Sequence, residues 1–247
     1  MTETSRERRA RQAIQRNILV VTLTLTTGAV DAVTFLYLGN VFSSVITGNM
    51  ALLGVAAGSR NSALAVNGGV ALAGYAIGAL LAGAIARRHE DGQPVWPARV
   101  TAALAVELGV LAVFSAGWLL TSGRPGGISQ LTLLSLTAAA MGMQSVAVQR
   151  LGRMSSTYLT STLTGVIVAL AVRQRPAEIH RSLGVFAAIV IGAVVGAITA
   201  RHARELAPAA ILIPITVVVV ASTAGASLAR RRSLARQPTH DSAVSDR

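Results

Sequence analysis

The sequence contains no cysteine, and charged residues make up only 13% of its 247 residues. Without cysteine there is no disulfide framework and no thiolate-ligated metal site. A typical soluble domain is about a quarter charged residues, so this composition argues against a soluble globular protein. Lysine is absent as well, so all 22 basic residues are arginine. We attribute the choice of arginine to genome composition, because alanine and glycine are abundant too.

What the sequence has instead is long apolar runs. Hydrophobic residues make up 52% of the chain, and the mean hydropathy is +0.58. The runs are about 20 residues long, and a helix of that length crosses about 30 Å of hydrocarbon at 1.5 Å per residue. The sequence therefore predicts an all-α, multi-pass membrane protein that forms one helix bundle.

The net charge of +12 does not indicate a nucleic-acid-binding protein, because the arginines lie in the tails and between the apolar runs. That distribution is typical of membrane proteins whose basic loops contact anionic lipid headgroups. We expect the lipid bilayer as a partner and no nucleic acid. The basic start of the chain resembles a signal peptide, but the run after it is about 22 residues, longer than the usual 7–15. We expect an uncleaved first helix.

Eight apolar segments are predicted, and together they form a single transmembrane domain over residues 17–228. Its halves are 17–120 and 128–228, flanked by a basic tail at 1–16 and a basic, disordered tail at 229–247. The segments are 17–38, 41–58, 63–86, 98–120, 128–148, 155–172, 183–200 and 208–228.

Segments 41–58 and 155–172 are unusually short and polar. Each begins with hydroxyl or amide groups and has a Thr-Gly step in its middle, and the two steps are 117 residues apart. A second pair of similar stretches, residues 78–89 and 192–202, is separated by 114 residues. Together they predict an internal repeat of about 115 residues. Interrupted segments in matching positions of two halves are typical of transporter binding sites, and glycine weakens a helix there.

The arginines between segments favour one topology. With eight spanning segments, the inner connectors hold five arginines and the outer ones seven; with 41–58 and 155–172 re-entrant, the split is eight inside and four outside. Basic residues concentrate on the cytoplasmic side. We therefore expect six full crossings plus two re-entrant segments in the bacterial inner membrane, with a cytoplasmic N-terminus. Eight spans remain the alternative.

Asp31 lies inside the first apolar segment, where an acid costs about 2.5–3.5 kcal/mol on insertion scales. It shares a helical stripe with small and polar residues, Thr24, Thr27, Gly28 and Thr34. One interpretation is a protonatable or cation-binding site that faces the bundle interior. The other is structural: a carboxyl group hydrogen-bonded to the second segment, fixing its shape. Both remain open from the sequence.

Further candidate lining residues lie in the short segments and in the middle of other helices. Thr47, Gly48 and Asn49 follow Asp31 across a Gly-Asn break, so a tight connection would return them to its depth. Their counterparts are Thr164 and Gly165. The alternative is structural: the glycine packs against a neighbouring helix, and the threonine hydroxyl bonds back to a carbonyl oxygen of its own helix.

Two more polar residues fall within apolar segments. Gln144 occupies the position in the second half that matches Asp31 to within about a residue, and could line a site or bond another helix. Glu107 could relay protons, pair with an arginine, or snorkel at the bundle edge. The patterns Gly74–Gly78 and Gly192–Gly196 predict close helix packing. Trp96 and Trp118, near segment ends, are typical of interfacial anchors.

Enzyme signals are missing from the sequence. The four histidines lie in connectors or the tail, and no His-Glu-x-x-His, Gly-x-Ser-x-Gly or Walker pattern occurs. We expect no catalytic residues, no metal site, no cofactor and no enzyme activity.

Two stretches resemble the YoaK-like family of bacterial membrane proteins. The first runs from Gly28 through Val30-Asp31-Ala32 to Thr47-Gly48-Asn49, and the second from Ala140-Met-Gly-Met-Gln144 to Leu163-Thr-Gly165. The resemblance covers about residues 15–230. Departures are Ser145, where similar proteins often have asparagine or alanine, and Ser155-Ser156, where a threonine pair is usual. It implies a multi-pass inner-membrane protein of unestablished function.

These observations predict a secondary transporter or permease for a small solute, coupled to protons through Asp31. A non-transporting scaffold or sensor that binds partner helices, including a homo-oligomer, is the alternative. The sequence identifies neither the solute nor the coupling ion.

Overall fold

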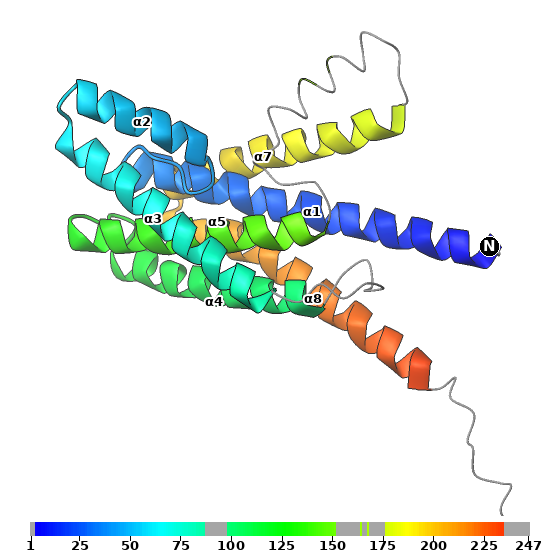
Figure 1. The fold of residues 1–247 in the computed structure, drawn as a ribbon. Helices are drawn as coiled ribbons and strands as arrows, with labels where there is room; N and C mark the ends of the chain where they lie inside the picture. Colours follow the sequence, from blue (N-terminus) through cyan, green and yellow to red (C-terminus); the bar gives the residue numbers. More distant parts are fainter. Residues whose placement is uncertain (1–2, 87–97, 152–163, 165–166, 168–175, 235–247) are drawn as a thin grey trace, which may run out of the picture.

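The computed structural model describes residues 3–86, 98–151, 164, 167 and 176–234, and in this part of the chain every regular element is helical (Figure 1). Seven α-helices follow one another, with a short 3₁₀ turn, η2 (Arg204–Leu206), before the last. The α-helices are α1 (Glu3–Tyr37), α2 (Ile46–Gly58), α3 (Ser62–Ile85), α4 (Ala98–Leu120), α5 (Ile128–Arg150), α7 (Pro176–His202) and α8 (Ala207–Leu234).

Within the described ranges, six stretches are long and apolar enough to cross a membrane, which confirms the all-α, multi-pass prediction. They are Ile14–Tyr37, Ser62–Ile85, Ala98–Leu120, Ile128–Arg150, Ser182–His202 and Arg204–Ala224. Helix α2 is different, because its 13 residues span only about 20 Å. Helices α1 and α8 also extend beyond the predicted transmembrane domain, since α1 includes most of the tail at 1–16 and α8 continues past residue 228.

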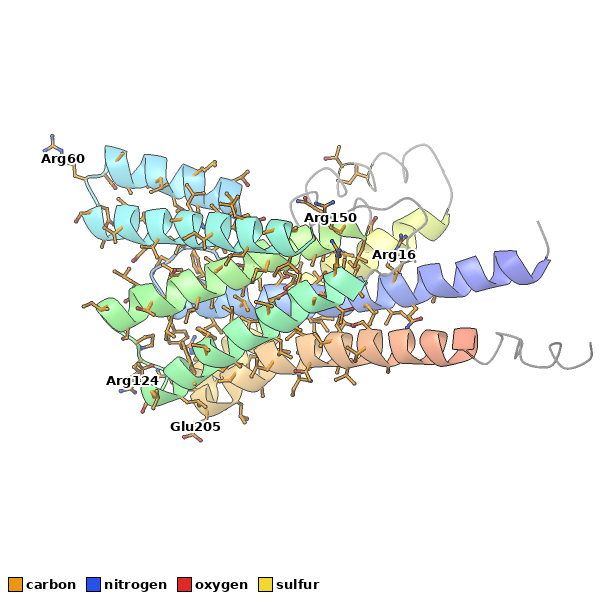
Figure 2. The ribbon with its side chains drawn as sticks, turned by 60° about the horizontal axis from the view of Figure 1, so that its bottom comes forward. Arg16, Arg60, Arg124, Arg150 and Glu205 are labelled. Atoms are coloured by element: carbon orange, nitrogen blue, oxygen red, sulfur yellow. The ribbon has the colours of Figure 1, made fainter. Side chains whose placement is uncertain are left out.

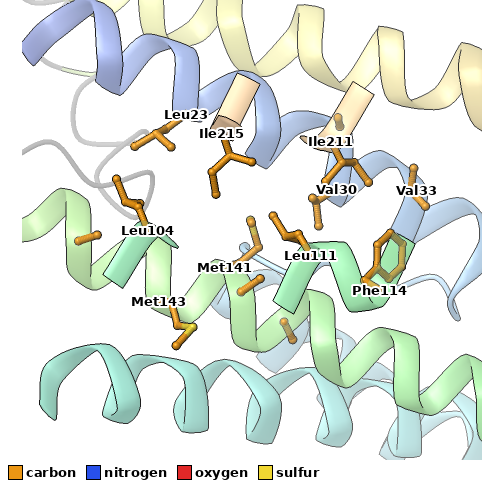
Figure 3. Packing of buried hydrophobic residues seen from close by; sticks show 14 of the residues in the cluster. Leu23, Val30, Val33, Leu104, Leu111, Phe114, Met141, Met143, Ile211 and Ile215 are labelled. Atoms are coloured by element: carbon orange, nitrogen blue, oxygen red, sulfur yellow. The ribbon is translucent and has the colours of Figure 1, made fainter. Parts of the chain in front are cut away.

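Helices α1 and α5 form the centre of the bundle. In each of them 67% of the spanning window is buried, against 28% in α3 and in α7. Side chains of α4 and α8 complete the apolar core; Figure 3 shows Leu111, Met141 and Ile215 facing one another from α4, α5 and α8. The outer helices α3 and α7 pack against α5 and α1, respectively.

Glycines make these two outer pairings close. A Cβ on Gly78 would lie 1.9 Å from the Ala139 carbonyl oxygen of α5, and one on Gly192 would lie 2.2 Å from the Leu25 carbonyl oxygen of α1. Such approaches require glycine, because any side chain would overlap the facing backbone. The predicted Gly-x-x-x-Gly contacts are therefore used between helices of the same chain.

Two contacts identify the ends of the bundle. At one end, the Arg16 guanidinium donates to the Leu151 carbonyl oxygen at 3.0 Å, which joins the start of the α1 span to the end of α5. At the other, the indole N–H of Trp118 donates to the Arg204 carbonyl oxygen at 2.9 Å, which joins the end of α4 to the start of α8. We call these the Arg16 end and the Trp118 end.

Trp118 is therefore not an interfacial anchor as predicted. Its side chain is fully buried, and its ring lies edge-on to Tyr37 with the ring centroids 5.7 Å apart. It fills the space between α1, α4 and the start of α8 because its N–H finds a buried carbonyl there. The other predicted anchor, Trp96, lies outside the described residues.

Candidate functional site

The site is built on the break between α1 and α2. Helix α1 ends at Tyr37, and after Leu38 the residues Gly39 and Asn40 have positive φ angles of 116° and 60°. Gly39 also needs the absence of a side chain, since a Cβ there would lie 2.1 Å from the Asn67 amide nitrogen. That amide, on α3, donates to the Gly39 carbonyl oxygen at 3.2 Å. The chain therefore turns back on itself here instead of continuing the helix.

The returning segment, residues 41–45, reaches the carboxylate of Asp31. The backbone N–H groups of Ser43 and Ser44 each donate to Asp31 Oδ1 at 2.9 Å. The Ser44 hydroxyl donates to Asp31 Oδ2. Asp31 is buried and lies six residues, or about 9 Å, before the end of α1. Residues 41–45 therefore return well below the end of α1 before α2 begins.

Asp31 fixes the residues that lead into α2 without capping that helix. Val45, which precedes α2, makes no side-chain capping bond. The N–H groups that donate to Asp31 belong to Ser43 and Ser44, which lie before Val45 and outside the helix. Hydrogen bonds from N–H groups to a carboxylate are charge-assisted and favour its ionised form. The arrangement is complementary to an anionic carboxylate.

A chain of hydroxyl groups fixes the same segment to α5. Ser43 Oγ lies 2.8 Å from Thr34 Oγ1 and donates to Thr137 Oγ1 at 2.9 Å. Thr137 in turn donates to the Leu133 and Leu134 carbonyl oxygens of its own helix. These three hydroxyls are fully buried, so segment 41–45 contacts both central helices through polar groups.

Asn49 holds the segment from the side of α2. Its amide oxygen accepts from the Phe42 N–H at 2.9 Å, and its amide nitrogen donates to the Phe42 carbonyl oxygen. Asn49 is fully buried, and its side-chain amide satisfies both the N–H and the carbonyl group of Phe42. Asn49 therefore connects the first turn of α2 to the segment that bonds Asp31.

The Thr-Gly step is not where the helix is interrupted. Thr47 and Gly48 lie in the first turn of an unbroken α2, and the interruption precedes them at residues 38–45. Thr47 is exposed, and Gly48 packs near its own neighbour Val45. The structure therefore brings neither of them to Asp31. Of their counterparts, Thr164 is helical and exposed, and Gly165 lies outside the described residues.

Gln144 connects the two central helices. Its amide nitrogen donates to the Leu23 carbonyl oxygen at 2.9 Å and to the Thr27 hydroxyl at 3.0 Å. Its amide oxygen is buried and accepts no hydrogen bond from the described residues. Thr27 lies one turn before Asp31 on α1, so Gln144 extends the polar contacts of that helix towards the Arg16 end. The predicted interhelical hydrogen bond is present, and a free acceptor remains beside it.

The predicted stripe on α1 is buried but does not form one polar surface. The hydroxyls of Thr24, Thr27 and Thr34 each bond back to a carbonyl oxygen one turn earlier in α1. Gly28 lies instead against α7, where a Cβ would be 2.1 Å from the Ile189 carbonyl oxygen. The residues share burial, and only Asp31, Thr27 and Thr34 contact other parts of the site.

A groove of about 530 Å³ opens beside Asp31. It runs between α1, α7 and the segment before α2, and Asp31 is its single ionisable lining residue. The other walls are apolar or small, namely Gly28, Ala32, Phe35, Leu36, Phe42, Val45, Ile189, Val190, Ala193, Val194 and Ala197. A few polar groups in an apolar concavity are typical of small-molecule sites.

Glu107 lies apart from these contacts on α4. Its side chain is fully buried, and neither carboxyl oxygen has a hydrogen-bond partner among the described residues. The predictions of a snorkelling acid and of an arginine pair are therefore wrong within this part of the chain. Burial excludes snorkelling, because a snorkelling group reaches the interface.

Sequence reasoning missed three members of the site. Thr137 gave no signal, because a single threonine in an apolar helix is usually back-bonded to that helix. Ser43 and Ser44 were visible as hydroxyls that open a short segment, yet nothing indicated that their N–H groups would be the main donors. Among the described residues, no group of three or more histidine, aspartate or glutamate side chains could hold a metal ion.

Comparison with known proteins gives a family but no further site. The profile of the DUF1275 family, described as a protein of unknown function, matches residues 19–224. The chain is 37% identical to the UPF0700 transmembrane protein YoaK of Bacillus subtilis (strain 168) over 157 residues, which are 63% of this chain and 67% of that protein. No solved structure matches.

Proposed function

Since the chain belongs to the DUF1275 family of multi-pass transmembrane proteins, whose description states no function, we propose a function from its own geometry. The chain is a secondary transporter or permease for a small solute. One observation carries the proposal: a buried carboxylate in a membrane helix holds a non-helical segment at its own depth and lines a groove. Non-helical backbone at membrane depth is tolerated where it is buried in protein or lines a cavity.

The glycine contacts support an internal repeat. Gly28 lies against residues 189 and 193, and Gly142 lies against residues 75 and 79. Gly142 lies 114 residues after Gly28, and residues 189 and 193 lie 114 residues after 75 and 79, so the two sets of contacts match. Gly78 against Ala139 and Gly192 against Leu25 follow the same offset. Matched contact partners are not expected from chance similarity of small residues, and they support a structural correspondence of the two halves.

The bundle ends support an inverted relation between the halves. The span of α1 begins at the Arg16 end, whereas its counterpart α5 finishes there. Opposed halves around sites built from broken helices are the architecture of many secondary transporters, in which one half rocks against the other. In this chain the break before α2 supplies such a site in the first half. Ser145 replaces Asp31 at the offset of 114, so the halves would differ in charge.

The distribution of arginine supports a cytoplasmic Arg16 end. Helices α3 and α5 finish at this end, and the connectors that follow them lead to α4 and α7. These connectors and the adjoining helix ends contain eight of the twelve arginines between apolar segments, whereas the Trp118 end contains four. The positive-inside rule then places both the N-terminus and the end of α8 in the cytoplasm.

Each site residue has a distinct proposed role. Asp31 holds the re-entrant segment and presents its charge to the groove. Asn49 keeps the segment extended, and the free amide oxygen of Gln144 offers an acceptor to water or solute. Glu107 is a second intramembrane acid that is available for proton coupling. No residue has a catalytic role in this proposal, and the protein is not an enzyme.

The alternative, a scaffold that binds partner helices through glycine faces, receives less support. Gly74, Gly78, Gly192 and Gly196 lie against backbone or side chains of their own chain. A large residue at Gly78 would therefore disturb the bundle itself, and loss of a partner in that variant would not identify a partner surface.

The transport proposal is tested in proteoliposomes that enclose a pH-sensitive dye. A panel of small solutes (amino acids, organic acids, amines and sugars) is applied outside, and internal pH is followed for the wild type and for Asp31→Asn. We expect at least one solute to move protons through the wild type and not through the variant. If no solute produces proton movement or labelled-solute uptake above empty vesicles, or if Asp31→Asn matches the wild type throughout, the proposal is wrong.

Water access to the groove is tested separately. The chain is naturally free of cysteine, so Ala193→Cys places the only thiol in the groove wall, and Val113→Cys places it on an exposed face of α4. Membrane-impermeant thiol reagents need the thiolate, which forms in water and not in hydrocarbon. A solute pathway predicts labelling at position 193 and protection at 113. Equal protection of both thiols would mean a groove filled by lipid or protein.

A further inference from the structure

A second concavity lies at the Trp118 end, away from the Asp31 groove. Its volume is about 950 Å³, and it opens between the connection from α4 to α5 and the junction of α7 with α8. Its lining is largely polar and basic: Leu119, Ser122, Gly123, Arg124, Arg201, His202, Ala203, Arg204, Glu205 and Leu206. Figure 2 labels two of the lining residues, Arg124 and Glu205, at this end of the bundle. None of these residues belongs to the proposed transport site.

The charge of this pocket is unusual for its position. The Trp118 end has four arginines, and three of them line the pocket; only Arg60 lies elsewhere (Figure 2). Three guanidinium groups against the single carboxylate of Glu205 leave two net positive charges, with His202 counted as neutral. Outward-facing ends of membrane proteins are normally poor in arginine. Arginines that only contact lipid headgroups can lie at any point around the rim. The gathering of three of them in one hollow therefore indicates a defined binding site.

The pocket is held in shape by contacts on its floor. The side chain of Arg204 packs on Gly123, where a Cβ would lie 2.9 Å from the Cβ of Arg204, and Gly123 has a φ of 66°. The Arg204 guanidinium lies over the Tyr37 ring, 5.7 Å from its centroid. Trp118 holds the Arg204 carbonyl oxygen. Because three contacts already hold Arg204 in place, this residue loses little further conformational entropy when a ligand binds.

The guanidinium groups remain available to a ligand. In the part of the chain that the structure describes, neither Arg124, Arg201 nor Arg204 donates a side-chain hydrogen bond or forms an ion pair, and Glu205 forms none. Arg124 and Arg201 are exposed, whereas Arg204 is half-buried. Five N–H donors on each guanidinium match the paired oxygens of phosphate and carboxylate groups.

We infer that this pocket is a binding site for a phosphate group on the side opposite the N-terminus. A doubly charged phosphate with several oxygens balances the two net charges and can face more than one guanidinium fork, which a single carboxylate cannot. The phosphate belongs either to a soluble phosphorylated molecule, whose phosphomonoester matches both charges, or to an anionic lipid headgroup, whose phosphodiester offers the same kind of oxygen acceptor with a single charge. The inference does not depend on the transport proposal, since it uses different residues at one end of the bundle.

The first experiment uses the purified full-length protein in a nonionic detergent. Inorganic phosphate is titrated at constant ionic strength, with chloride as the reference anion, and heat of binding is recorded for the wild type, Arg124→Gln, Arg201→Gln and Arg60→Gln. Both pocket arginines are exposed, so folding is expected to survive, and size-exclusion profiles check it. Arg60→Gln removes the same charge at the same end but outside the pocket. We expect binding about tenfold weaker in each pocket variant and unchanged in Arg60→Gln.

The second experiment separates the lipid source from the soluble one. The same four proteins are incubated with phosphatidylglycerol, and retained lipid is counted by native mass spectrometry. Saturable phosphate binding that needs Arg124 and Arg201 supports a soluble ligand. Retained phosphatidylglycerol with the same arginine dependence, and no phosphate binding, supports a headgroup in the same site. The inference is overturned if the wild type binds neither, or if Arg60→Gln loses as much as the pocket variants.

Discussion

Ser44 gives both its backbone N–H and its hydroxyl to the carboxylate of Asp31, thirteen residues earlier in the chain. The pair joins the inside of a membrane helix to the start of a short helix of 13 residues. The carboxylate fixes the shape of the second segment, as the structural interpretation expected, and it also lines a groove, whereas its role as a protonatable or cation-binding site stays a proposal.

Substitutions of Asp31 separate its structural role from the proposed role of its charge. Asparagine keeps an oxygen that can accept from the Ser43 and Ser44 N–H groups and gains an amide that can donate to the Ser44 hydroxyl, so the segment keeps its shape. Alanine leaves those groups unsatisfied, at a cost of about 1–3 kcal/mol for each buried donor. We expect Asp31→Ala to lower the thermal unfolding midpoint in detergent clearly and Asp31→Asn to lower it less. Equal losses in the two variants would contradict the hydrogen-bond account.

The comparison also sharpens the transport test. A stable Asp31→Asn protein that no longer moves solute would assign function to the charge itself. An Asp31→Asn protein that unfolds as readily as Asp31→Ala would make any loss of flux uninformative. Unfolding and flux are therefore measured on the same preparations.

Close packing by glycine predicts paired effects in the two halves. A Cβ at Gly28 or Gly142 would lie 2.1 or 2.2 Å from a facing carbonyl oxygen, so alanine must push α7 from α1 or α3 from α5. Gly83 and Gly109 are matched controls in membrane helices with nothing within 4 Å. Alanine there gains up to about 1 kcal/mol of helix propensity. We expect Gly28→Ala and Gly142→Ala to destabilise by similar amounts, and the control variants to be neutral or stabilised.

Resistance to unfolding in mixed detergent and dodecyl sulfate measures these differences. A clear loss in one half with none in the other would argue against corresponding helix pairs. A loss in the control variants would mean that the effect comes from glycine replacement in general and not from the close contacts.

The helices were predictable from the sequence because lipid imposes a simple rule: each span must be apolar and about 20 residues long. The break before α2 was only partly predictable. Its short length and hydroxyl groups were visible, but the Thr-Gly step drew attention to the wrong residues. The break is fixed by hydrogen bonds from backbone N–H groups twelve and thirteen residues after Asp31 to its carboxylate. Every residue except proline has such a group, so the sequence does not indicate which ones bond to Asp31. The burial of Trp118 was missed because its partner is the carbonyl oxygen of Arg204, which any residue would supply.

Single cysteines report the topology of the chain in intact cells. We place them at Ser59, Gly92, Ser122 and Ser182 in the cysteine-free background. Because α1 ends, and α2 also ends, on the side where α3 starts, impermeant reagents added outside should label positions 59 and 122 and leave 92 and 182 protected. Eight spanning segments would reverse the labelling at positions 59, 92 and 122, whereas position 182 is protected in both topologies and serves as an internal control. Labelling after permeabilisation checks that every thiol is reactive.

Glu107 should respond to substitution in the opposite way from Asp31. It is fully buried in α4, and its two carboxyl oxygens accept no hydrogen bond from the described residues. Glutamine has nearly the same shape and cannot carry the charge that a membrane interior disfavours. We therefore expect Glu107→Gln to unfold at the same or a higher temperature than the wild type, whereas Glu107→Ala should lose about 2 kcal/mol or more through the cavity it leaves.

The measurement is thermal unfolding in detergent beside proton movement in proteoliposomes. A stable Glu107→Gln protein with normal solute uptake but no proton movement would identify Glu107 as the coupling acid. A strong loss of stability on Glu107→Gln would mean that a partner exists outside the described residues. Normal stability and normal proton movement together would leave the carboxyl group as a packing residue only, because a group that neither bonds nor carries protons contributes only its volume.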